Sequence, residues 1–325
     1  MTLFRSLSAF SLSLVALLST SSAWAQQNYP NRPVKIIVPF AASGPADNYA
    51  RFMAQRLQDA LGQPFVVDNR PGAGSIIGTD AVAKSPADGY TLLMMSNTQT
   101  VNESLIPTKP FSLLKDFAPI APVNYSDLVL VVNPSVQANN LQDLIKLAKA
   151  NPAKFNYASS GNGTPYHMAG ELFKHMAGIQ LTHIPYKGSA GARTDVLSGQ
   201  VDMMFDAVTT MSENIKANKV KGIATTGRAR SNVLPDMPTM NEAGVPQYDA
   251  VIWLGLMAPA GTPEAIVSKL NAEINKIVNS ADVKATWSKQ GAVPMSMSVP
   301  VFTKFVADDV AKWANIVKVS GAKPD

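Results

Sequence analysis

Residues 34–47 read V-K-I-I-V-P-F-A-A-S-G-P-A-D, a short β-rich run followed by a turn and the start of a segment with helical periodicity. Gly44 is a plausible N-cap, and Pro45 follows at the first helical position, where the missing N–H of proline costs nothing. The pattern predicts a strand over 34–38 and a helix from Pro45 to about Leu61. Strand, loop and helix in this order are the repeating unit of an α/β fold.

The same alternation continues along the chain. An apolar run at 65–67 precedes a helical segment at 75–84, and the run at 90–95 is uniformly apolar, as in a parallel strand covered on both faces. A second series predicts strands at 128–132, 155–158, 181–184, 201–205 and 220–225, with helices at 141–150, 165–177, 189–198 and 208–217 between them. A strand near 249–257 and helices near 263–279, 282–290 and 300–319 follow. The predicted fold class is therefore α/β.

The composition excludes several classes of protein. Of 325 residues, 46% are hydrophobic and only 16% are charged, which favours a folded core and excludes intrinsic disorder. The absence of cysteine excludes a disulfide scaffold and any thiolate metal site. The net charge of +5 comes without a cluster of Lys and Arg, so we expect no nucleic-acid partner.

The first 25 residues are typical of an export signal. Arg5 precedes an apolar run at 7–18 that is diluted with serine, and Ala23-Trp24-Ala25 matches a cleavage pattern. The run is too short for a membrane-spanning helix, which needs about 20 mostly apolar residues. We expect cleavage after Ala25 and an exported product without a lipid anchor, because no cysteine follows the cleavage site.

Two α/β series in a chain of this length predict two lobes with a ligand cleft between them. The first lobe is expected to comprise 26–125 and 250–325, and the second 126–249. The chain would cross between the lobes near 122–128 and again near 246–252.

A second loop repeats the design of the first. Residues 159–165 read S-S-G-N-G-T-P, so Thr164 stands as the N-cap before a proline. Free backbone N–H groups and the positive end of the helix dipole attract anions, and Ser43, Ser159 and Ser160 add hydroxyl donors. A carboxylate held between the two loops would bridge the lobes. The alternative is that Gly, Ser and Pro simply make tight turns.

Several familiar motifs fail in this sequence. The glycines at 72, 74 and 78 are spaced one residue too widely for a dinucleotide fingerprint, so a turn into a helix is the better interpretation. No phosphate-binding G-x-x-x-x-G-K-[ST] motif is present. The sequence therefore gives no support for nucleotide binding, and we predict no cofactor.

His167, Glu171 and His175 recur on one helical stripe and could mimic a metal site. The stripe lacks the H-E-x-x-H order of zinc proteases, and His183 belongs to another element. We favour structural or solvent-facing roles and predict no metal site, although His167 is close enough to the second loop to contact a ligand.

A secreted α/β hydrolase acting on a carboxylate ester or amide is the alternative class. Such an enzyme would need a nucleophile on a G-x-S-x-G elbow, which is absent, and Ser160 beside His167 is the one candidate pair. We therefore predict no catalytic residues and no enzyme activity.

A family resemblance rests on motifs spread over nearly the whole mature chain. They are Y-P-x-x-P-V-K-I-I-V-P-F at 29–40, V-V-D-N-R-P-G-A-G at 66–74, D-G-Y-T-L-L at 88–93, Y-A-S-S-G-N-G-T-P-Y-H-M-A at 157–169, I-P-Y-K-G at 184–188, L-P-D-M-P-T-M-N-E-A-G at 234–244 and A-P-A-G-T-P at 258–263. In this order they resemble the tripartite tricarboxylate transporter receptors, also called Bug receptors.

The resemblance implies a two-lobed periplasmic binding protein of the type II, flytrap kind, with a central sheet and flanking helices in each lobe. It implies binding without chemistry, with the loaded receptor presenting its ligand to membrane permease subunits. In such receptors the loops corresponding to 40–47 and 159–165 hold one ligand carboxylate through backbone donors and ordered water. Here Ala42-Ser43-Gly44 stands where the family often carries a glycine pair. We also expect a monomer.

The ligand expected from the resemblance is an aromatic or aliphatic dicarboxylate, among family ligands that include tricarboxylates, acidic amino acids and terephthalate. The far end of the pocket is expected to use polar residues that follow strands or open loops, with helix capping as their alternative role; they are Asn97, Thr98, Lys187, Asp206 and Thr210. Asp47 is interpreted first as a residue that complements the helix dipole, and Asp206 as a carboxylate that holds a backbone or loop donor. The predicted ligand-binding residues are Phe40, Ala41, Ala42, Ser43, Gly44, Ala46, Asp47, Asn97, Thr98, Ser159, Ser160, Gly161, Gly163, Thr164, His167, Lys187, Asp206 and Thr210.

Overall fold

The computed structural model describes residues 29–324, and the predicted signal segment at 1–25 lies outside them. The first part of the chain contains β1 (Val34–Val38), α2 (Pro45–Leu61), β2 (Phe65–Asn69), η1 (Ala73–Ser75), α3 (Ile76–Ala83), β3 (Thr91–Ser96), α4 (Asn97–Leu105) and α5 (Leu113–Asp116). The middle contains β4 (Phe117–Val132), α6 (Leu141–Ala150), β5 (Asn156–Ser159), α7 (Pro165–Ala177), β6 (Thr182–Pro185), α8 (Ser189–Ser198), β7 (Met203–Ala207), α9 (Val208–Lys216) and β8 (Lys221–Thr225). The last part contains β9 (Val251–Pro259), α10 (Glu264–Asn279), α11 (Ala281–Gln290), β10 (Ala292–Pro294) and α12 (Val299–Ser320).

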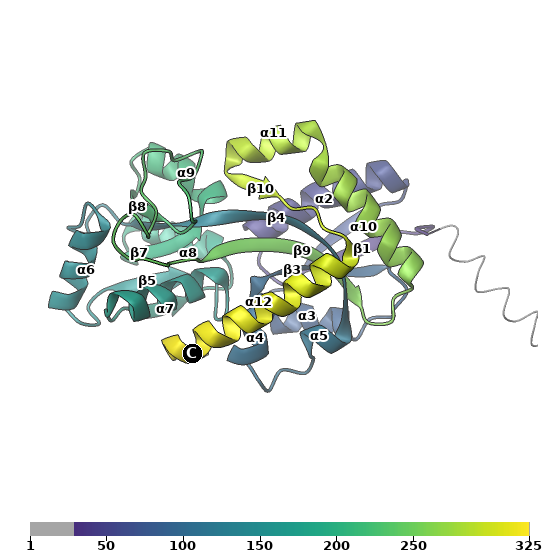
Figure 1. The fold of residues 1–325 in the computed structure, drawn as a ribbon, viewed down its shortest axis with the longest axis horizontal. Helices are drawn as coiled ribbons and strands as arrows, with labels where there is room; N and C mark the ends of the chain where they lie inside the picture. The colour runs from purple at the N-terminus through teal and green to yellow at the C-terminus, as the bar shows by residue number, and fades with distance from the viewer. Residues whose placement is uncertain (1–28, 325) are drawn as a thin grey trace, which may run out of the picture.

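The strands lie in the order β2-β1-β3-β9-β4-β7-β5-β6, and β8 and β10 also pair with β4. β1 is parallel to β2 and β3, and β5 is parallel to β6 and β7, whereas β4 and β9 pair antiparallel. Figure 1 shows β4 and β9 crossing the middle of the molecule between two α/β halves. We call the half that contains β1–β3 the first half and the half that contains β5–β8 the second half. The predicted α/β class is confirmed.

Strand β4 is much longer than the predicted strand at 128–132. It pairs with β9 up to Asp127, opposite Val251, and with β7 from Leu128 onward. Its first part escaped the sequence analysis because Pro119 and Pro122 interrupt it, and proline cannot donate to a ladder. The register with β9 shifts next to each of these prolines, so the strand continues through irregularities that its sequence reads as breaks.

Helix α12 packs against both halves. Phe302 and Val306 near its start belong to an apolar cluster with Trp253 of β9, whereas Trp313 and Ile316 belong to a cluster built largely from the second half. In Figure 1 the helix runs diagonally across the molecule, and its C-terminal end lies beside α7. Within residues 29–324, no helix combines the length and apolar character needed to cross a bilayer. The predicted lobe boundaries stay a prediction.

Replacing Trp313 with alanine tests the contact of α12 with the second half. Trp313 is 1% exposed, and emptying such a site costs about 3–5 kcal/mol of unfolding free energy, because contacts are lost and a cavity remains. Urea unfolding followed by circular dichroism should show this loss, whereas Lys318→Ala, on the exposed side of α12, should change stability by less than about 0.5 kcal/mol. A loss below 1 kcal/mol for Trp313→Ala would contradict the packing.

Candidate ligand-binding site

A small cavity lies between the two halves, next to the carboxyl ends of β1, β3, β5 and β6. Its lining residues are Phe40, Ala41, Gly44, Pro45, Ala46, Ser96, Thr98, Ser160, Thr164, Pro165, Tyr166, Gly188, Ser189 and Ile252. The centre of a water molecule fits into only about 30 Å³ of it, room for roughly two waters. The halves therefore lie close together around this cavity, and a larger ligand would need them to part.

The N-termini of α2, α4, α7 and α8 all reach this cavity. Each helix contributes residues of its first turn or its N-cap to the lining, two helices from each half. Helix N-termini carry partial positive charge and unpaired N–H groups. Of the residues that the structure describes, none with a charged side chain lines the cavity. Its electrostatic character therefore comes from the helix ends, which favour an anion.

The four N-termini differ in their caps. The hydroxyl oxygens of Ser96 and Thr164 accept hydrogen bonds from backbone N–H groups of their own helices, α4 and α7. Helices α2 and α8 instead begin after Gly44 and Gly188, and no side chain caps them. The first N–H groups of α2 and α8 thus have no side-chain acceptor, which is the arrangement that binds anions.

The loop after β5 is held from beneath by histidines. The backbone N–H of Gly163 donates to Nδ1 of His167 at 3.2 Å, and Ser159 Oγ lies 2.6 Å from Nε2 of His183. The rings of His167 and His183 stack with centroids 4.2 Å apart. Burial, with His183 and Lys174 nearby, lowers the pKa of His167 to about 3, so its ring is neutral. His167 supports the loop, since its Nδ1 accepts the hydrogen bond from Gly163.

The remaining residue of the histidine stripe with a buried side chain is Glu171. It accepts hydrogen bonds from Tyr157 and Lys174 at 2.6 and 2.7 Å. Across residues 29–324, no cluster of three or more His, Asp or Glu residues could hold a metal ion.

The loop after β1 is organised by Asp47. This carboxylate is 3% exposed and accepts hydrogen bonds from the backbone N–H of Ser43 at 2.9 Å and from Nε of Arg51 at 3.1 Å. Although burial favours its neutral form, these hydrogen bonds hold the pKa of Asp47 below its ordinary value. The carboxylate of Asp47 therefore interacts with groups of its own turn and helix. In this turn Ser43 adopts a left-handed φ of 67°.

The predicted site residues fall into three groups. The cavity is lined by Phe40, Ala41, Gly44, Ala46, Thr98, Ser160 and Thr164. Gly161 and Lys187 line an adjoining cavity of 200 Å³, which shares Phe40, Ser160 and Thr164 with the first, and Thr210 lines another of 270 Å³. Ala42, Ser43, Asp47, Asn97, Ser159, Gly163, His167 and Asp206 line none of these three cavities. Roles in binding for all three groups stay predictions.

Two of the residues expected at the far end of the pocket hold neighbouring elements. Asp206 is fully buried and accepts hydrogen bonds from Arg193 Nε at 2.7 Å, from the N–H of Ala207 at 2.8 Å and from Thr210 at 3.2 Å. Burial raises the pKa of Asp206, and Arg193 opposes this rise. Asn97 donates to the backbone oxygen of Val251 at 2.9 Å and so ties α4 to β9.

Half of the lining residues were not among the predicted binding residues, although Pro45 and Pro165 lie within the two predicted loops. They are Pro45, Ser96, Pro165, Tyr166, Gly188, Ser189 and Ile252. Gly188 and Ser189 carried a usable signal, because Gly188 follows a predicted strand and Ser189 begins the predicted helix at 189–198, an arrangement like that of the two loops chosen as anion sites. Tyr166 and Ile252 carried none, since only the approach of distant elements brings them to the cavity.

Glycines allow the two halves to approach each other. A Cβ on Gly188 would lie 2.8 Å from the Cβ of Ala41, and one on Gly163 would clash with Asn102 Oδ1. Both contacts join the second half to the first, so a side chain at either glycine would hold the halves apart.

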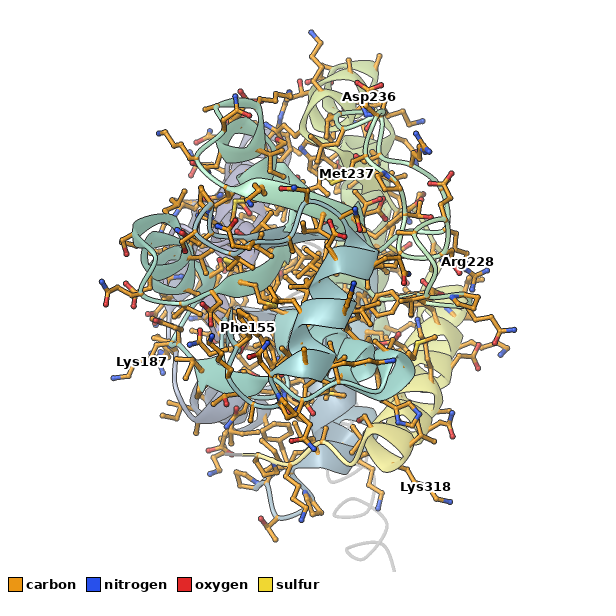
Figure 2. The ribbon with its side chains drawn as sticks, turned by 90° about the vertical axis from the view of Figure 1, so that its left-hand side faces the viewer. Phe155, Lys187, Arg228, Asp236, Met237 and Lys318 are labelled. Carbon is orange, nitrogen blue, oxygen red and sulfur yellow. The ribbon has the colours of Figure 1, made fainter. Side chains whose placement is uncertain are left out.

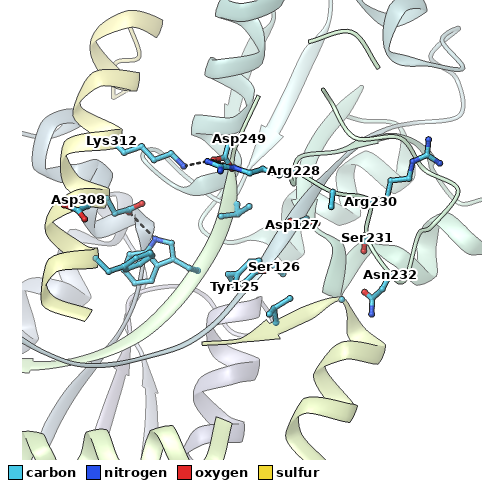
Figure 3. A pocket seen from close by; sticks show the side chains of 17 residues that line it. Tyr125, Ser126, Asp127, Arg228, Arg230, Ser231, Asn232, Asp249, Asp308 and Lys312 are labelled. Carbon is cyan, nitrogen blue, oxygen red and sulfur yellow. Dashed lines mark hydrogen bonds and ion pairs between the residues drawn. The ribbon is translucent and has the colours of Figure 1, made fainter. Parts of the chain in front are cut away.

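A larger cavity lies on the face of β9 opposite the small cavity. Ile252 lines the small cavity, while its neighbours Val251 and Trp253 line a groove of 720 Å³, because successive side chains of a strand point to opposite faces. In this groove Asp249 forms ion pairs with Arg228 at 2.9 Å and with Lys312 at 3.6 Å (Figure 3). Figure 2 shows Lys187 and Arg228 on opposite edges of the second half, so the adjoining cavity and the groove are on opposite sides.

Replacing Gly188 with alanine tests the contact between the halves. Its φ of 173° is extended, so the substitution creates no backbone strain, and the expected cost of about 1–3 kcal/mol arises from overpacking against Ala41. Small-angle X-ray scattering should show a larger radius of gyration. Adding Ala41→Gly should restore the original value. An increase that persists in the double variant would contradict a direct Gly188–Ala41 contact.

Replacing Asp127 with asparagine tests whether the groove raises the pKa of this carboxylate, through the pH dependence of the protein's stability. Burial and the neighbouring Asp249 raise the pKa of Asp127 to about 6. The folded state therefore binds this proton more tightly than the unfolded state, and wild-type stability falls as pH rises from about 4 to 6. Thermal unfolding should find Asp127→Asn more stable than wild type by about 1–3 kcal/mol above pH 6, with the difference vanishing below about pH 4. Asp308→Asn, at an exposed carboxylate of the same groove, is the control, and a pH-independent difference would refute the assignment.

A family model, a related sequence and two solved structures each match this chain over most of its length. The family model described as "Tripartite tricarboxylate transporter family receptor" matches residues 49–322. BugT of Bordetella pertussis is 39% identical over 311 residues, which cover 95% of each chain. The structure of R. palustris Rpa4515 with adipate is 33% identical with a TM-score of 0.88, over 91% of this chain and 100% of that one. MatC (Rpa3494) from Rhodopseudomonas palustris with bound malate is 29% identical with a TM-score of 0.85, over 89% and 100%.

The two α/β halves and the cavity between them define a solute-binding receptor with the periplasmic-binding-protein fold. It is a binding protein and not an enzyme, which excludes the hydrolase alternative. The chain belongs to the tripartite tricarboxylate transporter receptor family, the Bug receptors, as its motifs predicted.

Proposed function

We propose that this receptor captures a small aromatic or aliphatic dicarboxylate in the cavity between its halves and delivers it to a tripartite tricarboxylate-type permease. The site of action would be the periplasm, after removal of residues 1–25. The proposal treats the two halves as lobes, with 26–125 and 250–325 in the first and 126–249 in the second.

The convergence of four helix N-termini on a cavity that no charged side chain of residues 29–324 lines carries the proposal. These positive ends would repel a cationic solute, and a neutral solute would form weaker hydrogen bonds with the free N–H groups than a carboxylate does. Phe40 and Ile252 give the cavity apolar walls, which suit the carbon skeleton between two carboxylates. The relatives whose solved structures are described with adipate and with bound malate support the dicarboxylate class.

Closure would couple binding to recognition by the permease. The helix ends come from both halves, so a ligand that contacts all of them stabilises the closed arrangement by its differential affinity for it. Shifting a closed population from 1% to 99% needs about 5.5 kcal/mol. The hinge would lie where β4 passes from β9 to β7, at Asp127 and Leu128, and where the chain returns before Val251.

Thermal shift and calorimetry on residues 26–325 test the ligand class. A panel of aliphatic diacids, aromatic diacids, tricarboxylates and acidic amino acids should contain diacids that raise the melting temperature in a concentration-dependent way. Neutral amides of the same diacids should have no effect. If no carboxylate raises the melting temperature, the proposed function is wrong.

Replacing Ser160 with alanine tests the side of the cavity that borders the adjoining one. Ser160 lines both the cavity and the adjoining one, and its hydroxyl can donate to a carboxylate. Losing one hydrogen bond to a charged group should weaken carboxylate binding by roughly tenfold in calorimetry, with unfolding free energy unchanged within about 0.5 kcal/mol. Ser135→Ala is the control for binding, since Ser135 lines neither cavity and its hydroxyl donates to Asn133. Unchanged affinity for Ser160→Ala would remove Ser160 from the site.

A further inference from the structure

Among the described residues of the second half, three neighbouring polar groups belong to those that are buried without a hydrogen-bond partner. They are the hydroxyl oxygens of Tyr166 and Ser189 and the Nη2 atom of Arg193. Tyr166 and Ser189 are each 3% exposed, and both line the small cavity. Buried polar atoms are nearly always paired, so three such groups close together indicate an absent partner.

The three groups are neighbours. Ser189 and Arg193 stand four residues apart on α8 and therefore lie on the same face of that helix. Burial raises the pKa of Tyr166, Asp206 adds to the rise and Arg193 opposes it, so both charges are felt at the phenol. Arg193 uses its Nε to donate to Asp206, which leaves one arm of its planar fork free.

These groups lie away from the mouth of the cavity. Phe40, Ser160 and Thr164 border both the cavity and the adjoining one, which the exposed Lys187 lines, so we call their side the mouth end. Tyr166 and Ser189 border the small cavity and not the adjoining one. A ligand that places one carboxylate at the mouth end would direct its other end toward them.

We propose that Tyr166, Ser189 and Arg193 form a specificity subsite that binds the second carboxylate of the ligand. This inference rests on the proposed function and adds to it the residues that distinguish a diacid from a monoacid. All three groups can donate hydrogen bonds, and a carboxylate has two oxygens that accept several. The ion pair of Arg193 with Asp206 keeps the guanidinium oriented, while its free Nη2 supplies a charge-assisted donor.

The test compares affinities for acids of equal chain length. Calorimetry would pair succinate with butyrate, glutarate with valerate and adipate with hexanoate, using the mature chain. Wild type should bind at least one diacid more tightly than its monoacid. Tyr166→Phe should weaken that diacid by roughly tenfold and its monoacid by less than about twofold, because only the diacid loses a hydrogen bond to a charged group.

The melting temperature of Tyr166→Phe without ligand separates binding from structure. Its hydroxyl has no partner, so removing it leaves no other group unpaired and should not lower the melting temperature. Tyr49→Phe is the matched control, since the Tyr49 hydroxyl is also buried and unpartnered but borders a different cavity. It should leave both affinities unchanged. Ser189→Ala provides a second variant at the subsite with the same expected selectivity.

The outcomes distinguish the two proposals. If wild type binds neither member of any pair, the proposed function fails and the subsite falls with it. If wild type binds a diacid but Tyr166→Phe and Ser189→Ala leave the ratio of diacid to monoacid affinity unchanged, the proposed function stands and the subsite is refuted. In that case the three buried groups are satisfied by water alone.

Discussion

The N-termini of α2, α4, α7 and α8, which carry partial positive charge, meet in a cavity that no charged side chain of the described chain lines. The rest of the structure depends on this convergence. Each helix follows directly on a strand or a short loop after one, so the sheet order fixes where the helices begin. Free N–H groups can approach one another in so small a space only where side chains are absent. Gly44 and Gly188 supply that space and also leave α2 and α8 without side-chain caps.

The same strands that position the cavity separate it from the charges behind it. Ile252 faces the cavity, whereas Val251 and Trp253 face the groove that contains Asp127, Asp249, Arg228 and Lys312. The ion pairs of Asp249 reach from the second half across to α12, so they join the halves on the face away from the cavity. The charged side chains of the groove therefore lie on one face of β9, and the helix N-termini of the cavity lie on the other face.

Local signals in the sequence predicted most of the helices but not the whole site. The helices predicted at 45–61, 141–150, 165–177 and 189–198 have the same bounds in the structure, because caps, proline and glycine mark their ends. Helix α4 was missed because N-T-Q-T-V-N-E-S-L offers little apolar periodicity, and its start depends on the capping box of Ser96 and Gln99. Helix caps are recognised from neighbouring residues, so they allowed the loops after β1 and β5 to be predicted. The positions of Tyr166 and Ile252 at the cavity depend on tertiary approach, which no local pattern records.

A cavity that attracts anions through helix ends differs from one that uses a buried cation. An unpaired arginine would attract a carboxylate even with the halves apart, since its charge belongs to one side chain. Here no arginine of residues 29–324 lines the cavity, and Arg193, one helical turn after the lining residue Ser189, is paired with Asp206, so the pair adds little net charge. The remaining attraction comes from partial charges at helix ends that fade within about a turn. Since these ends come from both halves, the full set of donors exists only when the halves are close together, and affinity is thereby tied to closure.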